Sequence, residues 1–283
     1  MKGRLSGGED AEVVRRRRKT GPRAGLPAED HSRPRVTYIA TELRTSRSLA
    51  SLRSRTICSG GRVGRLLFGQ MSIDDVQRLV HLDDHGVRRA PWDELARGEL
   101  TATEQCIVDH VTAGLQRVRP SVVNEATVWS RAIFPLLSLA EEEGVELQAE
   151  VPLLARIGDT EIAGCLDGAL GKPFGGTLRA PFLVVVEAKR SVEGHDPIAQ
   201  LYGEVLAAAS LNALETGQSK QRIHGCYTIA ATWAFVRADI EGLDTERPRF
   251  SVVSSPEISE KLEAATIVKI FKSIVALHLR GEG

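Results

Sequence analysis

Two charged residues, Glu187 and Lys189, follow directly after the continuous apolar segment Phe182–Val186. An apolar, β-branched run of this length is typical of a strand that is buried on both faces of a sheet. Residues two apart in a strand point to the same face, so Glu187 and Lys189 project together from the strand's end. Because burying either charge alone is costly, the pattern predicts a charged partner, a metal ion or solvent at this position.

Asp167 is the candidate partner, since it lies in a second predicted strand, Glu161–Leu170, where a carboxylate is otherwise unfavourable. A loop over Gly171–Ala180 would make the two strands neighbours and place Asp167 beside Glu187 and Lys189. Two adjacent carboxylates repel each other, and a divalent cation is the usual remedy. Mg2+, or Mn2+ in its place, would polarise a phosphoryl oxygen and lower the pKa of a bound water. Lys189 would orient that water or stabilise the developing charge.

A structural alternative is that Glu187 and Lys189 form a surface ion pair and that Asp167 caps a turn. Three further residues are candidates for the surroundings of this site. Glu125 opens a predicted helix, where a carboxylate interacts favourably with the helix dipole. Gln200 shares a helix face with Glu204, so either could touch the site or both could be solvated. Arg190 directly follows Lys189 and could contact a phosphate.

The hydropathy pattern indicates an α/β protein, in which helices are followed by three strands, a helix, two strands and a final helix. The capping box Thr101-x-x-Glu104 marks one helix start. The predicted helices are Ser72–Leu82, one starting at Thr101, Asn124–Glu143, Asp196–Leu214 and Ser259–Leu279. The predicted strands are Leu147–Arg156, Glu161–Leu170, Phe182–Val186, His224–Ala238 and Phe250–Val253.

These residues and their order resemble the PD-(D/E)xK nuclease superfamily over roughly residues 120–280. The resemblance rests on Asp167, on Glu187-Ala188-Lys189 at the end of an apolar strand, and on the order of elements. It implies a restriction-endonuclease-like core, with a central mixed β-sheet flanked by helices and helical additions at the N-terminal side. It also implies Asp167, Glu187 and Lys189 as catalytic residues and a metal held by Asp167, Glu187 and Glu125. Gln200 and Arg190 would support the site.

The implied function is a Mg2+-dependent nuclease that hydrolyses phosphodiester bonds of nucleic acid, with DNA as the expected substrate. Two alternatives stay open. One is a catalytically inactive nucleic-acid-binding or scaffolding module on a nuclease-like fold. The other is a metal-dependent hydrolase that acts on RNA or on a smaller phosphodiester. Because no specificity module is recognisable, a homodimer or a partner subunit could supply specificity.

The net charge of zero hides two oppositely charged parts. Residues 1–70 hold 16 basic and 6 acidic residues, and residues 71–283 hold 21 and 31. The basic part predicts a disordered arm that binds nucleic acid, a targeting segment, or an extension ahead of a start at Met71. We expect three parts: this arm (1–70), a helical N-terminal segment (71–119) and the nuclease-like domain (120–283).

The cellular setting follows from cysteine usage and hydropathy. The four cysteines are scattered, without a C-x-x-C pair, which favours a reduced compartment. No apolar run reaches the roughly 18 residues of a membrane-spanning helix. We therefore expect an intracellular, cytoplasmic protein without a membrane partner.

Overall fold

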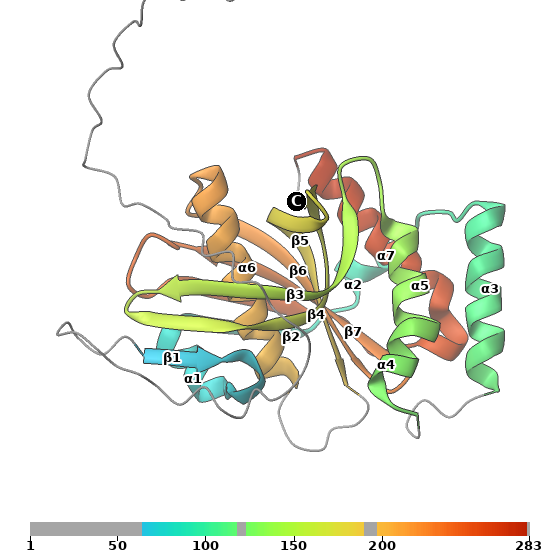
Figure 1. Cartoon of the computed structure of the whole chain (residues 1–283), viewed down its shortest axis with the longest axis horizontal. Coiled ribbons are helices and arrows are strands. Elements are labelled where there is room, and N and C mark those ends of the chain that lie inside the picture. Colours follow the sequence, from blue (N-terminus) through green and yellow to red (C-terminus); the bar gives the residue numbers. More distant parts are fainter. Residues whose placement is uncertain (1–63, 118–122, 190–196, 282–283) are drawn as a thin grey trace, which may run out of the picture. The chain divides into compact units, whose positions relative to one another are not determined.

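The computed structural model describes residues 64–117, 123–189 and 197–281, which form an α/β unit around one large mixed sheet (Figure 1). The main strand order is β1-β4-β5-β6-β7-β8-β2, and β3 and β9 pair with β4 and β7. The β1–β4, β5–β6 and β8–β2 pairs are parallel, and the other pairs are antiparallel. The α/β class and the central mixed sheet flanked by helices are thus as predicted.

The strands follow the chain in order. They are β1 Gly64–Leu67, β2 His81–Val87, β3 Glu146–Ile157, β4 Thr160–Phe174, β5 Thr177–Lys189, β6 Gln221–Ile229, β7 Thr232–Glu241, β8 Arg249–Ser254 and β9 Ile258–Ser259. The helices are α1 Ile73–Leu79, α2 Ala90–Leu95, α3 Ala102–Gln116, α4 Glu125–Val128, α5 Phe134–Leu137, α6 Pro197–Thr216 and α7 Glu260–Leu279. A π-helical turn, η3 (Trp129–Ile133), joins α4 to α5, and the short 3-10 helices are η2 (Phe68–Gln70) and η4 (Ser138–Ala140).

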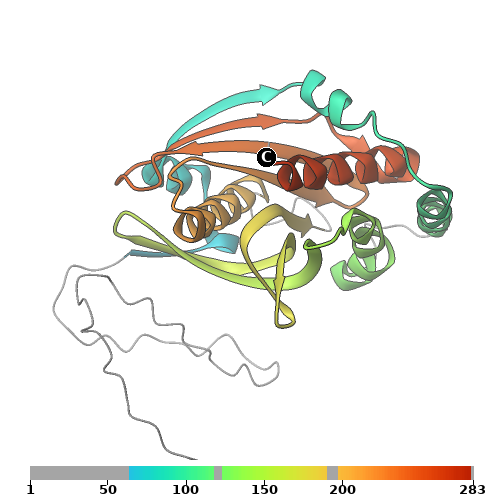
Figure 2. The ribbon, with the colours of Figure 1, turned by 90° about the horizontal axis from the view of Figure 1, so that it is seen from above.

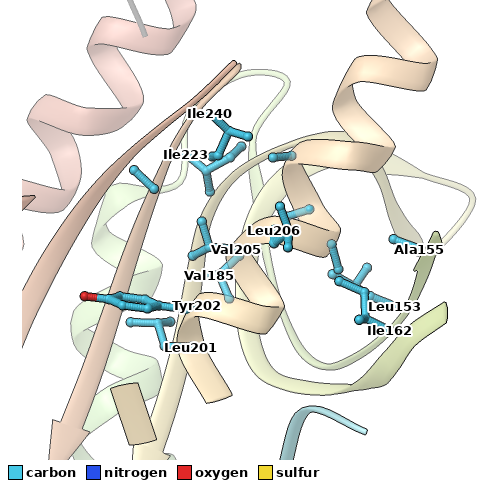
Figure 3. Close-up of a cluster of buried hydrophobic side chains, with 14 of the residues drawn as sticks. Leu153, Ala155, Ile162, Val185, Leu201, Tyr202, Val205, Leu206, Ile223 and Ile240 are labelled. Carbon is cyan, nitrogen blue, oxygen red and sulfur yellow. The ribbon is translucent and has the colours of Figure 1, made fainter. Parts of the chain in front are cut away.

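The two long helices, α6 and α7, cover opposite faces of the sheet (Figure 2). Val185 of β5 packs with the side chains of α6, and its neighbours Val184 and Val186 pack with those of α7. Alternate residues of a strand point to opposite faces, so this division follows from the pleat. Figure 3 shows Leu201, Tyr202 and other α6 side chains in the first of these clusters.

The residues just before and after Met71 differ from the prediction. Residues 64–70, which the charge pattern placed in the arm, form β1 and η2, and Phe68 is only 1% exposed. Phe68 packs so closely on Gly164 of β4 that a Cβ there would lie 2.4 Å from its ring. The segment after Met71 is not wholly helical either, since β2 joins the sheet beside β8. Residues 1–63 lie outside the described residues.

Two predicted boundaries are wrong for the same reason, because a tight turn was missed. The expected loop Gly171–Ala180 is instead a hairpin, in which β4 and β5 continue to a turn at Gly175 and Gly176. Both glycines have positive φ, 58° and 83°, a conformation that glycine adopts without strain. The expected single strand His224–Ala238 is likewise the β6–β7 hairpin, in which Ile229 pairs with Thr232.

No helix within the described residues is both long and apolar enough to cross a membrane.

Candidate active site

The three predicted catalytic side chains come together where β4 and β5 separate. The backbone ladder between these strands reaches the pair Gly168–Val186. Beyond it, the backbone N–H of Ala188 donates to Oδ2 of Asp167 at 2.7 Å. The Asp167 carboxylate therefore bridges the diverging strands instead of capping a turn, and it lies against the Glu187–Lys189 segment.

A close helix contact holds this end of β4 in place. A Cβ at Gly168 would lie 2.4 Å from Cη2 of Trp129, so the indole of η3 occupies the space that a side chain would need. Real Cβ atoms do not approach other atoms that closely, and position 168 must therefore be glycine for η3 to pack here. The same contact brings α4, with Glu125 in its first turn, to the edge of the site.

Glu187 is fully buried and forms an ion pair with Lys189. The Lys189 side chain is 28% exposed, so the ammonium lies between the buried carboxylate and solvent. The Lys189 ammonium contacts Oε1 of Glu187, and the Glu204 carboxyl group is a second hydrogen-bonding neighbour. A surface ion pair is therefore the wrong description, because this carboxylate has lost its water and interacts with buried neighbours instead.

Helix α6 adds a second buried carboxyl group behind Glu187. Glu204 has no exposed surface, and its Oε1 accepts a hydrogen bond of 2.9 Å from the amide of Gln200, which is 7% exposed. The possibility that both residues are solvated is thus excluded. Tyr202, between them on the helix, packs in the core with its ring centroid 5.5 Å from that of Phe250.

The buried carboxyl groups perturb one another strongly. Burial, and then the negative charge of Asp167, raise the pKa of Glu187 to about 7, while Lys189 opposes the rise. Burial, and then Glu187, raise the pKa of Glu204 well above its usual value. Burial acts against the Lys189 ammonium, but contact with Glu187 and the charges of Asp167 and Glu125 outweigh it and raise its pKa. These surroundings favour the protonated form of Glu204 and the ammonium form of Lys189.

Two more carboxylates act on the site from outside. Burial raises the pKa of Asp167, the Ala188 N–H and Lys189 lower it, and the charges of Glu125 and Glu150 raise it further. Glu125, a predicted metal ligand, is exposed on α4 within range of Asp167 and Lys189. Arg190, predicted to contact a phosphate, lies outside the described residues.

Glu150 is the residue that sequence reasoning missed. On β3, Ala149 pairs with Gly168 and Val151 with Leu166, so Glu150 lies opposite Asp167 where the pairing is interrupted. Its φ of 53° is in the left-handed region, which a glutamate adopts only at a cost. A glycine or asparagine at that position would have signalled the irregularity in the sequence, but a glutamate does not.

The donor set fits a hard divalent cation of low protein coordination. No group of three or more His, Cys, Asp or Glu side chains in the part of the chain that the structure describes is arranged to hold a metal ion. Mg2+ does not need such a group, because it keeps several waters and binds through one or two carboxylates plus substrate phosphate. Asp167 and Glu187 would supply those carboxylates.

Comparison with known proteins adds no family to this description, since neither a family model nor a curated protein matches the chain.

Proposed function

We propose that the chain is a Mg2+-dependent nuclease with a restriction-endonuclease-like core, and that it hydrolyses phosphodiester bonds of DNA. The observation that carries the proposal is the fully buried Glu187 carboxylate, which lies beside Asp167, the Lys189 ammonium and the buried Glu204. A structural ion pair would not need a third carboxyl group, Glu204, buried against it. The order β3-β4-β5-α6-β6 gives further support, because it matches the expected three strands, helix and strand.

Each residue has a role that its environment supports. Asp167 and Glu187 would hold the metal, and Glu125 stands where it could add an outer contact. When bound, Mg2+ supplies Lewis-acid polarisation of a phosphoryl oxygen. Lys189, partly exposed and charged, would orient the attacking water and stabilise negative charge developing on the phosphate. Because its pKa is raised, Lys189 acts as a fixed positive charge and not as a proton acceptor.

The buried layer behind the metal ligands would keep their geometry fixed. Gln200 donates to Glu204, and the protonated form of Glu204, which burial favours, would place a neutral group against Glu187. A second ionised carboxylate there would repel Glu187 within a region of low dielectric constant. Cleavage would leave 5′-phosphate and 3′-hydroxyl ends, as the resemblance to PD-(D/E)xK nucleases implies.

The test is Mg2+-dependent cleavage by the full-length chain and by Lys189→Ala, with plasmid DNA, single-stranded DNA and RNA as parallel substrates. We expect the wild-type chain to cut DNA with Mg2+ and not with EDTA. Removing one group that stabilises transition-state charge costs about 100-fold or more in rate, so Lys189→Ala should lose at least that much. Preferential cleavage of RNA would replace DNA as the substrate.

Lys220→Ala is the matched control, because Lys220 also forms an ion pair, with Glu241 at 2.7 Å, but lies on the exposed surface. It should cut at the wild-type rate. Calorimetric titration with Mg2+ separates a nuclease from an inactive binding module, since Asp167→Asn should weaken metal binding only if the site holds metal. Undiminished Mg2+-dependent cutting by Lys189→Ala would contradict the proposal.

A further inference from the structure

A polar cavity lies on the face of the sheet opposite to the candidate active site. It is enclosed by α2, β6, β7 and the last turns of α7. Its volume is about 420 Å³, and its lining includes Trp92, Arg222, His224, Arg237, Leu277 and Arg280. His224 is on the α7 side, because Cys226, two residues along β6, packs in the α7 cluster. The candidate active site is on the α6 side and further along β5, where Glu187 pairs with Tyr227. The two sites are thus separate.

The cavity carries more positive than negative charge. Three arginines line it, from β6, β7 and α7. Asp239 forms ion pairs with two of these arginines. It accepts a hydrogen bond of 2.6 Å from Nε of Arg222 and lies 3.5 Å from Nε of Arg237. The only acidic side chain in the lining is Glu94. Guanidinium groups from separate elements that converge on one cavity are suited to an anion with several acceptor oxygens.

The cavity also contains buried polar atoms without partners. His224 is only 2% exposed, and its Nδ1 has no hydrogen-bond partner among the described residues. The same holds for Nε1 of Trp92, which is 3% exposed. Buried polar atoms are normally satisfied, so a cluster of orphaned ones around a cavity indicates a ligand that completes them.

The neutral state of the histidines fits this role. Burial, and then the charges of His278, Arg222 and Arg237, lower the pKa of His224 well below its usual value. The ring of His278 lies 5.6 Å from that of His224, and burial lowers its pKa to about 4. Both imidazoles are therefore neutral at pH 7, where each has one N–H to donate, and the positive charge resides on the arginines.

The size and the apolar part of the lining restrict the ligand further. A cavity of this volume is within the range of small-molecule sites and exceeds what a single inorganic ion fills. Trp92, Leu95 and Leu277 form an apolar wall beside the arginines. We propose that this cavity binds a nucleoside monophosphate, with the phosphate held by Arg222, Arg237 and Arg280, and the nucleoside against the Trp92 side.

The test is calorimetric titration of the full-length chain with dAMP, deoxyadenosine and inorganic phosphate, in EDTA and about 150 mM salt. We expect one dAMP per chain, with phosphate alone at least ~10-fold weaker and deoxyadenosine weaker still. Arg237→Gln should weaken dAMP binding at least ~10-fold, while Asp239 keeps its hydrogen bond to Arg222. Arg280→Gln, at the exposed end of α7, should also weaken dAMP binding. Because this residue is exposed, the second variant keeps the test valid if Arg237→Gln misfolds.

Two controls locate the binding. Arg249→Gln removes an equally charged side chain that hydrogen-bonds Asp83 elsewhere on the surface, and it should bind dAMP like the wild type. Lys189→Ala should also bind normally, so the result does not depend on the nuclease proposal. The cavity proposal fails if dAMP shows no saturable binding, if Arg249→Gln loses as much affinity as Arg237→Gln, or if Lys189→Ala abolishes binding.

Discussion

Glu260 shows how a single buried carboxyl group affects the whole protein. It has no exposed surface, and neither of its oxygens has a hydrogen-bond partner among the described residues. Burial raises its pKa from 4.5 to about 7, and Trp233 and Lys261 oppose the rise. Between these values the unfolded chain has released the proton while the folded chain still holds it. The contribution of Glu260 to stability is therefore fully present below about pH 4.5 and is lost as pH rises through about 7.

Glu260→Gln should remove this dependence. A shift of this size corresponds to about 3 kcal/mol, so the variant should gain up to that much unfolding free energy over wild type between pH 4.5 and pH 8. Urea unfolding at several pH values measures the difference, in which the other titrating groups cancel. Glu257→Gln, on the exposed surface just before β9, removes a carboxyl group nearby and serves as the control. A constant difference for Glu260→Gln would contradict the prediction.

At the residue scale, the sequence predicts best what strand geometry alone decides. Glu187 and Lys189 share a face because they are two residues apart, and the structure pairs them. The proximity of Asp167 needed only that two consecutive strands be antiparallel neighbours. Glu204 remained undecided, because an (i, i+4) relation to Gln200 fixes a shared face and not its burial. Glu150 was missed, since its place in the site depends on an irregular backbone conformation.

At the level of elements, β3 carries a local distortion that can be tested by substitution. Glu150 and Ala230 are the two residues other than glycine with positive φ in the part of the chain that the structure describes, at 53° and 56°. Glycine relieves this conformation, which costs about 1 kcal/mol or more for other residues. Its own backbone entropy offsets part of the gain. Glu150→Gly and Ala230→Gly should therefore each leave the unfolding free energy unchanged or raised by up to about 1 kcal/mol.

Only Glu150→Gly should also change the electrostatics of the site. Cys165 has an exposed side chain that can be alkylated. Partial burial of its thiol raises the pKa of that thiol, and the charges of Glu150 and Asp167 raise it further. Removing Glu150 should lower that pKa and speed alkylation of Cys165 at pH 8, measured by mass spectrometry of its peptide. Ala230→Gly, in the β6–β7 turn, removes no charge and should leave the rate unchanged. Equal rates in the two variants would place Glu150 outside the range of the site.

The elements themselves were largely predictable, and their junctions were not. The capping box at Thr101 begins α3 as expected, and α6 and α7 lie within two residues of their predicted starts. The β6–β7 turn was missed because Ala230 and Ala231 carry no turn signal. The β4–β5 turn was missed because the glycines and prolines around it are also typical of a longer loop. Strand β1 was missed because it is only four residues long, and β2 was missed because its sequence is polar. Both enter the sheet only through partners distant in the sequence, β4 and β8.

For the whole molecule, the distribution of charge decides how a nucleic acid would be bound. Residues 1–63 hold 15 basic and 6 acidic residues, whereas residues 64–283 hold 22 and 31. A body with excess negative charge repels DNA except where metal or a local basic surface compensates. Each phosphate that a protein neutralises contributes about 0.9 to the slope of log affinity against log salt. The basic segment should therefore carry most of the salt-dependent affinity.

Fluorescence anisotropy with a labelled DNA duplex, at salt concentrations from about 50 to 200 mM, measures that contribution. We expect residues 64–283 alone to bind at least ~10-fold more weakly than the full chain at the lowest salt, and with a shallower slope. Replacing Arg15, Arg16, Arg17 and Arg18 by glutamine in the full chain keeps its length and removes four charges. The affinity and the salt slope of this variant should lie between those of residues 64–283 and those of the full chain, because charge and not chain length provides the attraction. Equal affinity and equal slope for all three proteins would instead assign DNA binding to the acidic body, where a bound metal or a local basic surface would have to compensate the negative charge.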